Sequence, residues 1–145
     1  MTLNSQQIAL IQSAVPTIVA QSEAVASAFY AQLFALDPSL RAMFRGDMTE
    51  QGRKLMQMLG VALSNLDKLD TLRPALRALG ERHLNYGVSD HHYSVVGTAL
   101  INTLELLLGE AFTADTRAAW ATLYGDLTHA IKSGLYPVVT EAAAD

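Results

Sequence analysis

The sequence predicts an all-α protein, and three observations support this prediction. Apolar residues recur at the three- and four-residue spacing of amphipathic helices along almost the whole chain. No segment alternates apolar and polar residues as a half-buried strand does. Only four prolines and nine glycines interrupt the pattern in 145 residues. This length is typical of one domain, so we expect a single domain over residues 1–145 with one core.

The first half of the chain is predicted to hold three helices and a short helical turn. The helices run from Asn4 or Ser5 to Val19, from Ser22 to Leu36, and from a cap at Thr49 to about Leu66. Pro16 is expected to kink the first helix. Pro38 ends the second, because the residue before a proline is pushed out of the helical region, and a short turn then reaches Met43. Residues 44–48 are predicted to form a corner at Gly46.

The second half is predicted to hold three longer helices, which gives about seven helical segments in all. They run from about Thr71 to just before Gly87, from a cap at Ser89 to about Leu108, and from a cap at Thr113 to about Tyr136 or beyond. Pro74 is tolerated because it falls in a first turn, and Gly109 marks the end of the second of these helices.

Composition excludes several classes of function. The formal net charge is −4 and the basic residues are scattered, so we expect neither nucleic acid nor a membrane surface as a partner. The absence of cysteine excludes disulfides, thiolate metal ligands and thiol nucleophiles. The sequence shows no secretory signal pattern and no apolar run approaching about 18 residues, so a cytoplasmic protein is expected.

One histidine lies on a helix face that should be buried. Leu72, Leu76 and Leu79 form an apolar stripe at helical spacing, and His83 continues it. Such a histidine is either a core residue with its hydrogen bonds satisfied or a metal ligand whose second ring nitrogen is oriented by a carbonyl of the preceding turn.

Two more polar side chains and one aromatic point to the same interior. Gln51 lies one turn before Leu55 on an apolar face, where its amide either reaches solvent near the helix start or donates into a cavity. Tyr30 also lies on an inward face, where its hydroxyl donates either to the main chain or into a cavity. Phe44 occupies the predicted corner. Three inward polar groups from three helices are together harder to explain as core residues than each one alone.

Several fragments of the sequence match one pattern. They are Phe29-Tyr30-Ala31-Gln32-Leu33-Phe34 with Pro38, Leu40 and Phe44; Gln51 with Leu55; His83 with Gly87-Val88; His92-Tyr93 with Val95-Val96-Gly97; and Ala119-Trp120 with Tyr124-Gly125. Over about residues 7–124 the chain therefore resembles the bacterial haemoglobins and the globin domains of flavohaemoglobins.

The resemblance implies a globin fold whose helices sandwich a haem b, held non-covalently because cysteine is absent. It assigns His83 as the ligand of the iron, and Tyr30 and Gln51 as hydrogen-bond donors on the opposite, distal side, where O2, CO or NO would bind. Phe44, Leu55, Val88 and Tyr93 are implied to contact the haem. The expected function is reversible binding of O2 for storage, delivery or sensing.

The chain departs from the family pattern in two places. Family members often carry, on the last helix, a glutamate that strengthens the iron-binding histidine as an electron donor, and the matching position here is near Leu135. Flavohaemoglobins continue into flavin and nicotinamide domains, so turnover is expected to need an external reductase. Two alternatives therefore stay open, a nitric oxide dioxygenase served by such a reductase and a haem-free globin-like interaction protein. The oligomeric state is not predicted.

Overall fold

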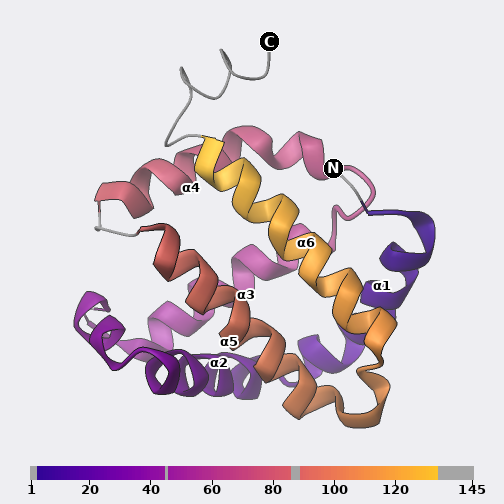
Figure 1. Cartoon of the computed structure of the whole chain (residues 1–145), viewed down its shortest axis with the longest axis horizontal. Coiled ribbons are helices and arrows are strands. Elements are labelled where there is room, and N and C mark those ends of the chain that lie inside the picture. The colour runs from indigo at the N-terminus through magenta and orange to yellow at the C-terminus, as the bar shows by residue number, and fades with distance from the viewer. Residues whose placement is uncertain (1–2, 45, 86–88, 134–145) are drawn as a thin grey trace.

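The computed structural model describes residues 3–44, 46–85 and 89–133, with only the backbone at residues 83–85 and 133 (Figure 1). The six α-helices of this part are α1 (Ser5–Ala20), α2 (Ser22–Leu36), α3 (Met48–Leu63), α4 (Arg73–Asn85), α5 (Asp90–Leu108) and α6 (Ala114–Ser133). Three short 3₁₀ helices join them, η1 (Pro38–Met43), η2 (Leu69–Leu72) and η3 (Gly109–Ala111). The described residues contain no strand, so the prediction of an all-α fold is confirmed.

Most helix boundaries follow the local signals in the sequence, but α3 differs at both ends. Its cap is Asp47, whose carboxylate accepts the N–H of Thr49 at 2.9 Å, so the prediction of a cap at Thr49 is wrong. The helix ends at Leu63, before the predicted Leu66. Just beyond that end, the Ser64 hydroxyl donates to the carbonyl of Gly60 and the Asn65 amide to that of Val61. These side chains satisfy the last carbonyls and terminate the helix.

The main core lies between α1, α3, α5 and α6. Trp120 is fully buried in it, in one cluster with apolar side chains of the other three helices, including Ile11, Leu59 and Leu104. A second cluster forms where α2 packs against α5 and around η1. The α6 helix thus contributes the largest fully buried side chain, Trp120. The α2 helix contributes Tyr30 to the second cluster.

The α4 helix packs against the second half of α6, and the two backbones approach closely at Gly80 (Figure 1). A Cβ atom built on Gly80 would lie 2.1 Å from the carbonyl oxygen of Ile131. Because a main-chain carbonyl cannot rotate away as a side chain can, this crossing requires glycine. The contact fixes α4 on α6 one turn before His83.

A second close approach joins α5 and α6. A Cβ atom on Gly97 would lie 2.6 Å from the Tyr124 ring, and the Tyr124 hydroxyl donates to the carbonyl of Tyr93 at 2.5 Å. Burial raises the pKa of the Tyr124 hydroxyl above its usual value, so this donor keeps its proton. Gly97 therefore lets α6 anchor the first turns of α5 from the side.

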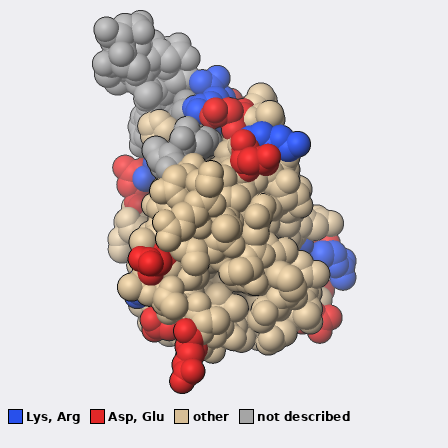
Figure 2. All heavy atoms as spheres, turned by 90° about the vertical axis from the view of Figure 1, so that its right-hand side faces the viewer, with Lys and Arg blue, Asp and Glu red and all other residues tan. Residues whose placement is uncertain are grey.

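Charge is distributed unevenly over the surface. Residues 1–22 contain no Lys, Arg, Asp or Glu. The face seen on turning the right-hand side of Figure 1 toward the viewer carries its charged side chains mainly at the rim (Figure 2). By length and composition alone, the segment Asp90–Ala111 could cross a membrane; in the described structure α5 packs against α2 and α6.

Candidate functional site

Aromatic side chains from two adjacent segments gather around Tyr30. The ring centroid of Tyr30, on α2, lies 5.4 Å from that of Phe44, which follows η1, with the two rings nearly perpendicular. Phe34 stacks on Tyr30 at 6.0 Å and meets the edge of Phe44 at 5.5 Å. Leu55 of α3 belongs to the same cluster. The structure thus brings together three of the predicted site residues, Tyr30, Phe44 and Leu55.

The Tyr30 hydroxyl is the polar group of this apolar cluster. It donates to the main-chain carbonyl of Gln51 at 3.2 Å, which joins α2 to the first turn of α3. Burial raises the pKa of the hydroxyl to about 12, so it remains a donor at neutral pH. The Gln51 side chain is half-buried, so its exposure is intermediate between the solvent-exposed amide and the cavity-facing amide that the sequence allowed. Tyr30 and Gln51 are therefore neighbours. Of the two alternatives for the Tyr30 hydroxyl, donation to the main chain or into a cavity, the structure shows donation to the main chain.

The apolar side chains around this site are covered only in part. Phe44, Leu55 and Val96 are half-buried. The α3 helix packs mainly on α2, with further contacts to α1, whereas α4 packs on α6. Half-covered apolar side chains beside a single hydroxyl donor suit a flat, largely apolar group of the haem kind, and the described residues therefore fit such a group.

Two of the predicted site residues, His83 and Val88, lie partly or wholly outside the described part of the structure. The backbone of His83 lies in α4, three residues after the Gly80 crossing, and its side chain is outside the described part of the structure. Val88 lies outside the described residues altogether, as does Leu135, where the family pattern has a glutamate. Their predicted roles stay predictions.

Tyr93 is buried on the α4 side of the fold, where it packs with Leu76 of α4 and Ile131 of α6. The ammonium group of Lys132 lies 5.1 Å from the centre of its ring and 3.2 Å from a carboxylate oxygen of Asp90. No signal in the sequence singles out Lys132, because no spacing links it to residues about 40 positions earlier in the chain.

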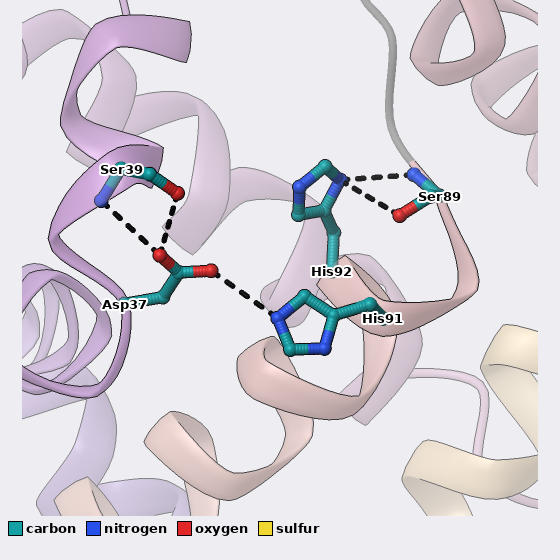
Figure 3. A network of polar contacts seen from close by, with 5 residues as sticks. All are labelled: Asp37, Ser39, Ser89, His91 and His92. Carbon is teal, nitrogen blue, oxygen red and sulfur yellow. Dashed lines mark hydrogen bonds and ion pairs between the residues drawn. The ribbon is translucent and has the colours of Figure 1, made fainter.

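A polar network links η1 to the start of α5 (Figure 3). The Asp37 carboxylate accepts the N–H of Ser39 at 3.1 Å and its hydroxyl at 2.6 Å, and lies 3.2 Å from Nε2 of His91. The Ser39 hydroxyl bond, followed by the contacts with His91, lowers the pKa of Asp37. Nδ1 of His92 accepts the N–H of Ser89 at 2.9 Å and caps α5. The network ties the segment before Phe44 to the segment before Tyr93.

Comparison with known proteins agrees with this architecture. The family model for the globins matches residues 27–131. The chain is 30% identical to flavohemoproteins of Bacillus subtilis and Chromobacterium violaceum, in each case over 97% of its own length. It spans only 37% and 36% of the lengths of these two relatives.

Solved structures give the same result. A bacterial globin from Campylobacter jejuni superposes with a TM-score of 0.81 at 26% identity, over 93% of this chain and 99% of that one. A proposed nitric oxide dioxygenase from Rhodothermus marinus, engineered as a carbene transferase, superposes with a TM-score of 0.84 at 27% identity, over 98% of this chain and 99% of that one. Since the family model matches residues 27–131, most of its length, the chain belongs to the globin family.

Proposed function

We propose that this protein binds haem, as haem b, and takes up O2 and other diatomic molecules reversibly beside it, for storage, delivery or sensing. The observation that carries the proposal is the Tyr30 hydroxyl, a proton donor set among the rings of Phe34 and Phe44 and next to Gln51. A donor in apolar surroundings forms a stronger hydrogen bond with a small polar ligand than one in water.

The residues have distinct tasks in this proposal. His83 would hold the haem iron, and Phe44, Leu55, Val88 and Tyr93 would contact the ring. When bound, haem supplies an iron centre that coordinates O2, CO and NO. Phe44 and Leu55 keep water away from the ligand, while Tyr30 and Gln51 orient it by hydrogen bonds.

The test of this proposal is a titration of the purified protein with haemin, followed by absorption spectra in the ferric state, the ferrous state and the ferrous state with CO. We expect saturation at one haem per chain and a Soret band that moves on reduction and again with CO. A protein that stays colourless with haem in excess would contradict the proposal and favour the haem-free interaction protein.

A Tyr30→Phe variant tests the distal donor. Loss of a hydrogen bond worth about 1 to 1.5 kcal/mol should raise the O2 dissociation rate about 5- to 13-fold in stopped-flow experiments. CO serves as the internal control, because it is a weaker hydrogen-bond acceptor and its dissociation rate should change little. Since the pKa of Tyr30 is about 12, the O2 rate of the unsubstituted protein should not vary between about pH 6 and pH 10. Equal O2 rates in variant and parent would mean that Tyr30 serves only to bond the Gln51 carbonyl.

A second candidate function is the conversion of NO and O2 to nitrate. It is favoured by the likeness to a proposed nitric oxide dioxygenase and by the flavohemoprotein relatives. This activity would need electrons from a reductase. Sustained nitrate formation with NADH and a flavin reductase would support it, and a single equivalent of nitrate per haem, with no further turnover, would favour reversible ligand binding.

A further inference from the structure

Lys132 is a cation held at a defined place near the α4 side of the proposed haem pocket. We propose that its charge favours the ferrous over the ferric state of the haem, which makes Lys132 a tuning residue that acts without touching the cofactor. The inference rests on the haem binding proposed above. Nothing in the motifs that identify the family involves this residue.

Two contacts fix the ammonium group. It lies 3.2 Å from Oδ1 of Asp90, in the first turn of α5, and 5.1 Å from the centre of the Tyr93 ring, close enough for a cation–π contact. The Lys132 side chain is 32% exposed, whereas that of Asp90 is 68% exposed. The Lys132 side chain is thus more deeply placed than that of Asp90, so we expect Asp90 to cancel the field of Lys132 only in part toward the interior.

The backbone places Lys132 next to the part of α4 that carries His83. The preceding residue, Ile131, makes the close contact with Gly80, three residues before His83. Tyr93, which lies under the ammonium group, packs against Leu76 of the same helix. Lys132 thus lies beside α4, the helix that carries the expected iron ligand.

The direction of the effect follows from charge alone. Reduction adds one electron and lowers the charge of the haem by one unit, with the electron coming from a reductase or, in the experiment, from dithionite. A nearby fixed cation repels the more positive ferric state more than the ferrous state, so it makes reduction easier. No proton transfer is needed. Removing the cation should therefore make the haem harder to reduce.

The experiment is a spectroelectrochemical titration of the haem-loaded protein and four variants. At the potential where the parent is half reduced, the ferrous-to-ferric ratio should fall about three- to tenfold in Lys132→Met, as expected for one partly screened charge, and further in Lys132→Glu. Asp90→Asn should raise the ratio, because it removes the partner anion. Lys68→Met, which removes an exposed lysine between α3 and α4, is the matched control and should leave the ratio unchanged.

The possible failures are distinguishable. A protein that takes up no haem overturns the proposed function and this inference together. A normal Soret band with an unchanged ratio in Lys132→Met, or a lower ratio in Asp90→Asn, overturns the inference alone. Should Lys132→Met fail to fold, Lys132→Gln, which also removes the charge but keeps a polar side chain, decides the matter by the same fall in the ratio.

Discussion

Replacing Gly80 by alanine is expected to lower the free energy of unfolding by about 2 to 3 kcal/mol, the upper part of the range for overpacked sites. The added methyl group would lie 2.1 Å from the carbonyl oxygen of Ile131, so α4 and α6 must separate or shift along each other. Either movement displaces the backbone that carries His83. We therefore expect weaker haem retention as well as lower stability, measured by urea unfolding and by transfer of haem to apomyoglobin.

Gly125→Ala is the matched control for Gly80→Ala. Gly125 is exposed in the middle of α6, and a Cβ atom there would meet no atom within 4 Å. Alanine should raise stability at this position by up to about 1 kcal/mol, because glycine is a poor helix former. Equal changes in the two variants would show that the α4–α6 crossing can open without cost, contrary to the geometry.

A His83→Ala variant is expected to lose most of its haem during purification, the largest functional effect we predict. The reason is that α4 contains no other histidine that could replace His83, and a haem without an axial ligand keeps only its apolar contacts. The haem content, read from the pyridine haemochrome spectrum, is the measurement.

Two further variants sharpen the test of His83. His129→Ala removes an exposed histidine from α6 and should bind haem as the parent does. His83→Gly should recover haem when imidazole is added, because free imidazole can fill the space left by the side chain. Full haem content and an unchanged CO spectrum in His83→Ala would refute the assignment of the iron ligand.

Most of the fold could be predicted from local signals. The bounds of α2 were predicted correctly because a proline follows at position 38 and sets its end. The cap of α3 was not, because Asp47 and Thr49 are both capping residues two positions apart, and only the path of the corner at Gly46, with φ of +83°, decides between them. The sequence also did not predict that a separate 3₁₀ helix, Leu69–Leu72, precedes α4.

For the candidate site, the sequence could predict only which side chains point into the interior. Periodicity shows that Tyr30 points inward, but it cannot show that the hydroxyl meets the Gln51 carbonyl, because main-chain acceptors leave no trace in residue identity. The need for glycine at position 80 could not be predicted either, because the carbonyl that excludes a larger residue belongs to Ile131, some 50 residues further along the chain. Lys132 was missed because its partners lie on a different helix.

The separate anchoring of α3 on α2 and of α4 on α6 has a consequence for how the protein opens. Without a cofactor between them, these two helices share little direct contact, and α4 should open at a lower free energy than α3, whose Leu59 and Leu63 lie in the main core. A bound group that touches both helices would couple their opening. Amide hydrogen exchange should therefore show different opening free energies for α3 and α4 in the haem-free protein and converging values once haem is added. In that case the ligand site would also be the place where the two helices are stabilised against each other.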